Sequence, residues 1–294
     1  MNLQLGIDEN GLGPLLGPLV ISGILLEGKI QEWFPGVADS KKFFTSSDRD
    51  SRKRLELFSL AIFHALHGYL PENPACFIKN VAPRADCLTG TDLCWSCLAS
   101  SFPYCQEEEI INLSASWRQW EEKQKVKLKN LYCEIFCPAR LNAFFQQGHS
   151  KSFVDFCGFA EVIRHLATDA VTIQAGKIGG TKNYLTWLRY TFPEARIKIL
   201  KETHQLSTYQ LIFPEKVFTL NFSVEVEKKS FAAASASLIG KFVRELFMES
   251  INKKLDSKFR ISGYRDKKTK AFLIRLLPQL EKKNIPSSCL IRNA

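Results

Sequence analysis

The sequence predicts an α/β fold, in which helices flank a sheet. Segments with the two-residue periodicity of strands alternate along the chain with segments that have the periodicity of amphipathic helices. The composition, 45% hydrophobic and 24% charged, is that of a soluble globular protein and excludes a disordered or collagen-like chain. The 294 residues suffice for one large domain or two modest ones, with a substantial core.

The N-terminal part predicts a β-hairpin followed by a helix. Residues 3–7 alternate as in a strand, and residues 8–11 are expected to end it with a turn. Residues 19–26 form an apolar run that is typical of a second, buried strand. The serines at 46–47 can cap a helix whose apolar stripe runs through residues 55–66.

The alternation resumes after a stretch that we expect to be irregular, residues 71–110, which is rich in Pro, Cys and Ser. Helices are predicted over residues 117–131, 154–166, 181–192 and 235–255, and strands over residues 132–137, 170–175 and 197–200. Pro138 is expected to break the chain after the strand that precedes it. The helix at 235–255 is the clearest, because its apolar residues form one wide face.

Positive charge is concentrated near the C-terminal end. The chain has 40 Lys and Arg against 30 Asp and Glu, a net charge of +10. Residues 249–294 hold twelve basic and four acidic residues, a net charge of +8. We therefore expect a main domain over residues 1–250 and a basic, helical C-terminal region over residues 251–294. Such a region favours a polyanion such as nucleic acid, although a solvated basic face would look the same. The candidate phosphate contacts are Lys253, Lys254, Lys258, Arg260 and Arg265.

We expect a cytoplasmic protein that is not associated with a membrane. The apolar stretch 13–26 is shorter than the ~20 residues of a membrane helix, and the first residues lack the features of a secretory signal. The nine cysteines are an odd number, which favours reduced thiols over a disulfide framework. Cys94 and Cys97 have the spacing of a zinc-binding pair, but Cys87 and Cys105 stand alone, so Zn²⁺ is not expected.

Two adjacent carboxylates follow the first predicted strand. Asp8 and Glu9 stand beside Gly11 and Gly13 in the predicted turn. Neighbouring carboxylates repel each other unless a proton or a cation lies between them, and Mg²⁺ and Mn²⁺ prefer oxygen ligands. The pair is therefore a candidate metal site, although a capping Asp beside a solvated Glu would show the same pattern.

The wider motifs resemble the type 2 ribonuclease H family, the ribonuclease HII-like enzymes. Residues 6–19, GIDENGLGPLLGPL, resemble the family's opening pattern GxDExGRGxxxGP. Residues 39–42, DSKK, resemble its DSKKL, and residues 230–245, SFAAASASLIGKFVRE, resemble its AAASIxAKxxRD helix. The pair 263–264 resembles a GY near the family's C-terminal end.

The resemblance extends from about residue 3 to residue 272, but the Cys-rich segment 70–150 matches poorly. Leu12 replaces the Arg of the family's GRG turn and is followed by Gly-Pro. This GLGP variant is more similar to a divergent bacterial branch of the family. Because the arginine contact is absent, specificity for an RNA–DNA junction is not assumed.

The resemblance implies a ribonuclease H-like mixed sheet flanked by helices. It also implies an endonuclease that cuts the RNA strand of RNA–DNA hybrids, or 5′ of a ribonucleotide embedded in DNA, with divalent metal held by four carboxylates. On this basis Asp8, Glu9 and Glu227 are the expected catalytic and metal-binding residues, with Glu225 as the alternative register for the last. The expected nucleic-acid contacts are Gly11, Gly13, Lys41, Lys42, Lys241 and Tyr264.

The third acid of the family's set is missing. Its position falls on Gly176, or alternatively on Ala175, and neither has a carboxylate. Asp169 lies seven residues before Gly176, about 20 Å along an extended strand, and cannot easily replace it. Either another acid reaches the site, or the site binds fewer metal ions and has reduced or no activity.

We therefore expect a metal-dependent endonuclease of ribonuclease H type with weak activity, using Mg²⁺ or Mn²⁺ and acting as a monomer on an RNA–DNA hybrid or a ribonucleotide-containing duplex. The alternative is a catalytically inactive relative that binds nucleic acid, which Gly176 and Leu12 favour. A third hypothesis is a zinc-bearing scaffold built on residues 87–105.

Overall fold

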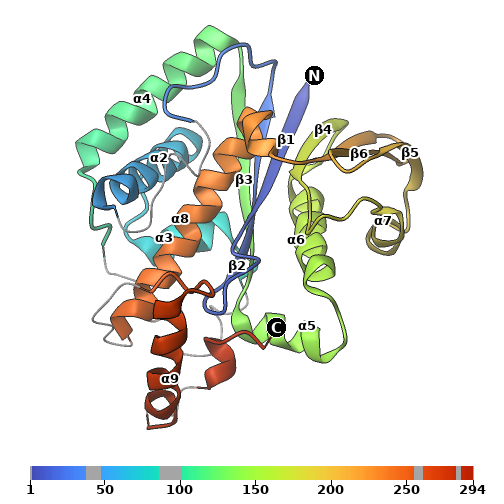
Figure 1. Ribbon diagram of the computed structural model, residues 1–294. Helices are drawn as coiled ribbons and strands as arrows, with labels where there is room; N and C mark the ends of the chain where they lie inside the picture. Colours follow the sequence, from blue (N-terminus) through green and yellow to red (C-terminus); the bar gives the residue numbers. More distant parts are fainter. Residues whose placement is uncertain (1, 38–47, 86–100, 255–260, 283–285, 294) are drawn as a thin grey trace.

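The computed structural model describes residues 2–37, 48–85, 101–254, 261–282 and 286–293 (Figure 1). Its centre is a seven-stranded sheet with the order β3-β2-β1-β4-β7-β6-β5. The strands are β1 (Leu3–Asn10), β2 (Leu19–Glu27), β3 (Lys127–Phe136), β4 (Val171–Gly176), β5 (Arg196–Glu202), β6 (Leu206–Ile212) and β7 (Val217–Ser223). β4 is parallel to both of its neighbours, β1 and β7, whereas all other neighbours are antiparallel. The expected α/β fold with a mixed sheet is confirmed.

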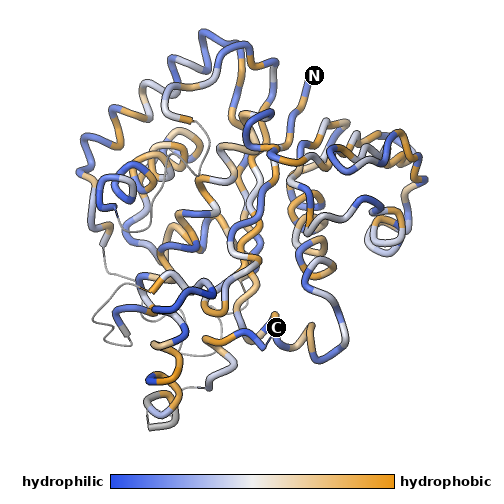
Figure 2. Tube along the Cα trace, in the orientation of Figure 1, coloured by the Kyte–Doolittle hydropathy of each residue, from blue (hydrophilic) through white to orange (hydrophobic). Residues whose placement is uncertain are grey.

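Helices cover both faces of this sheet. They are α2 (Arg49–His67), α3 (Pro74–Val81), α4 (Glu107–Gln124), α5 (Pro138–Gln146), α6 (Lys151–Leu166), α7 (Leu185–Thr191), α8 (Phe231–Lys254) and α9 (Lys267–Lys282), with short 3₁₀ turns η2 (Val226–Lys228) and η3 (Ser287–Cys289). One buried cluster joins the sheet to α2, α3, α4 and α8, and a second joins it to α5, α6 and α7 (Figure 1). Figure 2 shows apolar residues concentrated along the central strands.

The alternation of side chains along β1 positions its acidic end. Leu5 and Ile7 belong to the cluster on the α6 side of the sheet. Gly6 points to the other face, where an added Cβ would lie 2.1 Å from the backbone of Ala232. The glycine therefore lets α8 pack directly against β1. Asp8, two residues further on, faces the same helix.

Several elements lie where the sequence predicts them. The N-terminal hairpin is present as β1 and β2, and α6, β4, β5 and α8 match predicted elements closely. The expected turn at 8–11 is wrong, because Asp8 to Asn10 continue the pairing with β2 and the chain turns only at Gly11 (φ +94°). Helix α2 is capped by Asp48, which accepts from the N–H groups of Asp50 and Ser51; residues 46–47 lie outside the described residues.

The stretch 71–110, expected to be irregular, needs the largest correction in its described part; residues 86–100 lie outside the described residues. It contains α3, where Asn73 caps the helix and Pro74 occupies the first turn, and it ends with the start of α4. The helix predicted over 117–131 ends at Gln124, and the next residues pair with β2 as β3. Pro138 does not end the secondary structure but begins α5. Strands β6 and β7 were not predicted, and α7 is shorter than the predicted 181–192 helix.

The C-terminal region contacts the loop between β1 and β2, residues 11–18, which we call the glycine loop. The backbone N–H groups of Leu15 and Leu16 donate to the carbonyl of Gly263, and Leu16 bridges to Ile291. Leu16, Met248, Ile251 and residues of α9 form a third small buried cluster. None of the helices in the described part of the chain combines the length and the apolar character that a membrane span requires.

Candidate active site

The predicted catalytic and metal-binding residues line one cavity, together with those nucleic-acid contacts of the family motifs that the structure describes. The cavity has a volume of about 800 Å³ and lies where β1 and β4 end, beside η2 and the first half of α8. The residues are Asp8, Glu9, Gly11, Gly13, Gly176, Glu227, Lys241 and Tyr264. Lys41 and Lys42 lie outside the described residues. The chain thus brings together at one end of its sheet side chains that are far apart in the sequence.

Gly176 lies beside the two N-terminal acids. The parallel ladder between β1 and β4 runs from Leu3 opposite Val171 to Ile7 opposite Ala175, so Asp8 is next to Gly176. A Cβ added to Gly176 would lie 3.2 Å from Oδ1 of Asp8 and 3.4 Å from Oε2 of Glu9. A side chain at 176 would therefore begin in close contact with the oxygens of these two carboxylates.

The carboxylates at this end of the sheet raise one another's pKa. Burial is the main cause that raises the pKa of Asp8 from 3.8 to about 7, and the charge of Glu227 adds to it. A hydrogen bond with Ser237 and the charge of Lys241 act in the opposite direction. Burial, followed by the charge of Asp8, also raises the pKa of Glu9. The site is therefore an acidic cluster with a strong electrostatic demand for a cation or a proton.

Of the two register alternatives for the fourth acid, Glu227 interacts with the cluster. Its charge raises the pKa values of Asp8 and Glu9. Glu225 also lines the cavity, but its carboxylate pairs with Lys228 at 2.5 Å and is exposed. Glu225 has the left-handed backbone conformation (φ +52°) and directly precedes the 3₁₀ turn η2, which contains Glu227.

One acid that we did not predict belongs to the same cluster. Asp155, on α6, has 0% exposed surface, and neither of its carboxylate oxygens has a hydrogen-bond partner. Burial and the charge of Asp8 raise its pKa, and its own charge raises the pKa of Glu9. The sequence feature that could have revealed Asp155 is its position between Val154 and Phe156, on the apolar face of a predicted helix.

The donors of this cluster suit a hard divalent cation, because all of them are carboxylate oxygens. Among the residues that the structure describes, no three acidic, His or Cys side chains converge on one point as ligands around an ion would. The unpartnered oxygens of Asp155 are the feature that a cation would satisfy.

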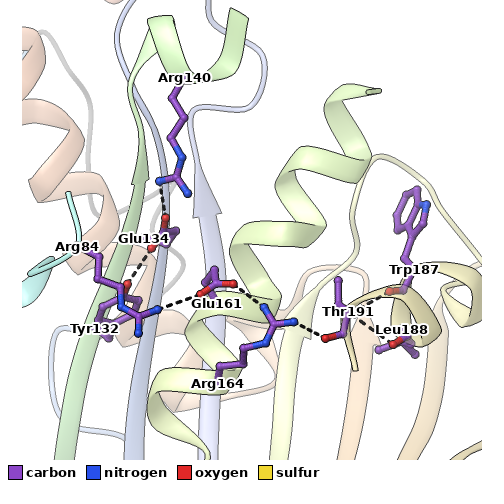
Figure 3. Close-up of polar contacts among 9 residues, drawn as sticks. All are labelled: Arg84, Tyr132, Glu134, Arg140, Glu161, Arg164, Trp187, Leu188 and Thr191. Atoms are coloured by element: carbon purple, nitrogen blue, oxygen red, sulfur yellow. Dashed lines mark hydrogen bonds and ion pairs between the residues drawn. The ribbon is translucent and has the colours of Figure 1, made fainter. Parts of the chain in front are cut away.

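Helix α6 is held against its neighbours by polar contacts on its outer side (Figure 3). Glu161 accepts from Arg84 at 3.3 Å and from Arg164 at 2.5 Å. Arg164 also donates to the carbonyl of Thr191 at the end of α7. The ring of His165 stacks on Tyr132 of β3, with centroids 3.9 Å apart. These contacts fix the position of the helix that contains Asp155.

An arginine from the C-terminal end stabilises the glycine loop. Arg292 is 5% exposed and donates to the carbonyls of Gly17 at 2.8 Å and Gly11 at 2.5 Å. Leu12, the position at which the family pattern has Arg, packs against the core on the α6 side. A further buried arginine, Arg244, stacks over the ring of Tyr264 at 5.1 Å. Two arginines thus lie beside the loop although its own arginine is absent.

The described cysteines are free thiols, as expected: Cys76, Cys105, Cys133, Cys137, Cys157 and Cys289. Cys105 donates from Sγ to the carbonyl of Lys53 at 3.3 Å. The other cysteines of the zinc hypothesis, Cys87, Cys94 and Cys97, lie outside the described residues.

Comparison with known proteins finds ribonucleases of type 2. No family model matches the chain. Over 61 residues the chain is 41% identical to ribonuclease HII of Francisella philomiragia and 43% identical to that of Francisella tularensis subsp. novicida. The matched part is 21% of this chain and 29% of each relative, so the chain spans less than a third of the length of the curated relatives it matches.

Similarity to solved structures extends over the whole chain but is low. The chain covers 94% of the structure of the PCNA:RNase HII complex from Archaeoglobus fulgidus, with a TM-score of 0.45 and 15% identity. It covers 92% of ribonuclease H2 from Pyrococcus horikoshii OT3, with a TM-score of 0.45 and 14% identity. It covers 66% of Bst-RNase HIII in complex with Mn²⁺, with a TM-score of 0.47 and 10% identity. These matches include 98–99% of this chain, but scores below 0.5 do not assign a function.

Proposed function

We propose that this chain is a metal-dependent endonuclease of ribonuclease H type, which cuts RNA in an RNA–DNA hybrid or in a ribonucleotide-containing duplex. The observation that carries the proposal is the cavity itself. Asp8, Glu9 and Glu227, chosen from sequence motifs, line it together with the glycine loop. The 61-residue similarity to ribonuclease HII supports the same class of activity.

The residues of the cavity would have different roles in the reaction. Asp8, Glu9 and Glu227 would hold Mg²⁺ or Mn²⁺, which when bound activates water and stabilises the leaving oxygen. Ser237 orients Asp8 by a hydrogen bond, and Lys241 contributes the positive charge that favours ionised Asp8. Carboxylates that are ionised and held in place are what a divalent cation requires.

The neighbouring surface suits a nucleic-acid backbone. Gly13 has open space where a Cβ would be, and Gly11 has the positive φ of a tight turn, so backbone N–H groups there can approach a phosphate closely. Tyr264 is 48% exposed at the cavity and can stack on a sugar or base. Arg265, the next residue, is exposed and belongs to the basic C-terminal region.

A second candidate function is nucleic-acid binding without cleavage. The missing carboxylate at Gly176 favours it, and so does the lack of convergence of three acidic ligands among the described residues. Metal dependence separates the two functions, because only the nuclease needs ionised acids and a metal ion for its reaction.

The test is cleavage of a labelled RNA–DNA hybrid in Mg²⁺ and in Mn²⁺. We expect slow, metal-dependent cleavage that Asp8→Asn abolishes. Asp169→Asn, an exposed acid at the opposite end of β4, is the matched control and should cleave like the natural protein. Hybrid binding with no cleavage by the natural protein in either metal would reject the nuclease and support the alternative.

A further inference from the structure

Asp155 is a buried acid whose hydrogen-bonding capacity is unused. It has 0% exposed surface, and both carboxylate oxygens lack a partner. A carboxylate removed from water is strongly destabilising unless hydrogen bonds or a cation compensate it. Its neighbours Val154 and Phe156 are buried apolar residues that anchor α6 to the sheet. A packing role alone would be served better by an apolar side chain.

The position of Asp155 suggests why a carboxylate is kept at this buried site. The start of α6 lies against the loop that follows β4, since a Cβ on Gly179 would be 2.6 Å from Oγ of Ser152. Among the two acids at the end of β1, the charge of Asp8 acts on Asp155, and the charge of Asp155 acts on Glu9. Asp155 therefore lies on the α6 side of the sheet, within electrostatic range of these two acids.

Gly176 leaves the region between these acids without a side chain. Oδ1 of Asp8 and Oε2 of Glu9 lie 3.2 Å and 3.4 Å from the place where its Cβ would be. An acid on α6 would approach Asp8 and Glu9 from the α6 side of the sheet, and an acid at 176 from the opposite side, because Ala175 faces α6. This chain has the acid on α6 and a glycine on β4.

We propose that Asp155 replaces the acid that β4 lacks at Gly176, and that it completes a four-carboxylate site for Mg²⁺ or Mn²⁺ with Asp8, Glu9 and Glu227. The inference rests on the proposed function, because that function gives the site its cation. It adds a metal ligand from an element that the sequence motifs do not include. Since no three ligands converge in the described structure, binding must draw these side chains together.

The experiment measures Mn²⁺ binding by the full chain, by calorimetry and by the electron paramagnetic resonance signal of free Mn²⁺. We compare the natural protein with Asp155→Asn, Asp155→Leu and the control Asp169→Asn. Both variants at 155 should weaken Mn²⁺ binding at least about tenfold, the usual scale for losing a group that supports a metal. Without metal their melting temperatures should be equal to or above that of the natural protein, because a repelling buried charge is gone.

A double variant separates a ligand from a structural residue. If Asp155 stands in for the missing acid, adding Gly176→Asp to Asp155→Asn should restore most of the Mn²⁺ affinity, which a merely structural role would not predict. Unchanged Mn²⁺ affinity in both Asp155→Asn and Asp155→Leu would overturn the inference. If Asp8→Asn still abolished binding in that case, the proposed function would survive. A natural protein that binds no Mn²⁺ would overturn both.

Discussion

At the residue scale, the absence of a side chain at Gly176 allows the carboxylates of Asp8 and Glu9 to lie close together beside β4. Its missing Cβ leaves room for the oxygens of Asp8 and Glu9, which lie 3.2 Å and 3.4 Å from that point. Its φ is not in the left-handed region, so the backbone itself tolerates other residues. The crowding at this position is therefore a matter of charge rather than of backbone conformation.

Gly176→Asp should lower stability without metal and recover it with Mn²⁺. A further carboxylate beside Asp8 and Glu9 adds like-charge repulsion, which we expect to cost about 1–2 kcal/mol. Mn²⁺ binds the folded state and should raise the melting temperature of this variant more than that of the natural protein. Because Asp155 already supplies an acid, cleavage should rise little.

Gly176→Ala is the matched control, since it adds the Cβ without the charge. Thermal unfolding with and without Mn²⁺, and hybrid cleavage, would be measured for both variants. A rate gain of tenfold or more in Gly176→Asp would show that the missing ligand limits the reaction and that Asp155 does not replace it.

The site illustrates what sequence motifs can and cannot locate. Asp8, Glu9 and Glu227 were found because they belong to local patterns with fixed spacing. Asp155 was not, because only the packing of α6 against the sheet brings it near β1. Arg292 was missed for the same reason, since it reaches the glycine loop from the other end of the chain.

At the element scale, predictions succeeded where a segment has one strong periodicity. β2 and α8 are buried along most of their length, so their apolar runs are unambiguous. Pro138 was interpreted as a break, although proline is equally suited to the first turn of a helix. β7 was missed although its apolar and polar residues alternate, which is the pattern of a strand with one buried face.

Helix α2 contains a buried acid whose pKa gives a pH-dependent stability. Oε1 of Glu56 accepts from the N–H groups of Tyr104 and Cys105, both at 2.9 Å, and Oε2 has no partner. Burial, the largest cause, raises the pKa of Glu56 from 4.5 to about 6. The folded state thus binds this proton more tightly than the unfolded state. The resulting stability is complete below pH 4.5 and is lost as the pH rises through about 6.

Glu56→Gln should therefore be more stable than the natural protein at pH 7, by about 2 kcal/mol at most. The amide oxygen can still accept the two backbone hydrogen bonds, while the buried charge is removed. The difference should shrink towards zero near pH 4.5. Urea unfolding at several pH values measures it, with Glu122→Gln on the exposed side of α4 as the control. A variant that is less stable at pH 7 would contradict this account.

At the scale of the whole molecule, the C-terminal end of the chain contacts the glycine loop, which lines part of the cavity. Arg292 joins the C-terminal end to the carbonyls of Gly11 and Gly17, and the backbone of Gly263 binds the same loop. The C-terminal region therefore helps to fix a wall of the candidate active site. Truncating it would alter the site as well as remove positive charge.

Arg292→Met should destabilise the protein by about 2–4 kcal/mol, because two buried carbonyls lose their donor. Arg275→Met, an exposed position on α9, should change stability by less than about 0.5 kcal/mol. Thermal unfolding measures both, and hybrid cleavage by Arg292→Met should fall as the glycine loop loosens. Equal stability of the two variants would show that Arg292 does not hold the loop.

The distribution of charge over the molecule predicts how it binds nucleic acid. Lys253 and Arg265 are exposed in the C-terminal region, and Arg265 follows Tyr264 directly. Lys198 and Lys201 are exposed on β5, the far edge strand of the sheet. Each phosphate contact releases counterions, so the logarithm of the affinity should fall with the logarithm of the salt concentration by roughly 0.9 per contact on duplex DNA.

We expect the double variant Lys253→Gln/Arg265→Gln to bind an RNA–DNA hybrid more weakly. The slope of its log affinity against log salt concentration should be shallower, by the equivalent of up to about two phosphate contacts. Lys198→Gln/Lys201→Gln removes the same charge from the other edge and should leave the slope unchanged. Because net charge is identical in the two variants, a difference between them reports position and not overall attraction. Titration of a labelled hybrid at several salt concentrations gives both slopes. Equal slopes in the two variants would place the nucleic-acid surface elsewhere on the protein.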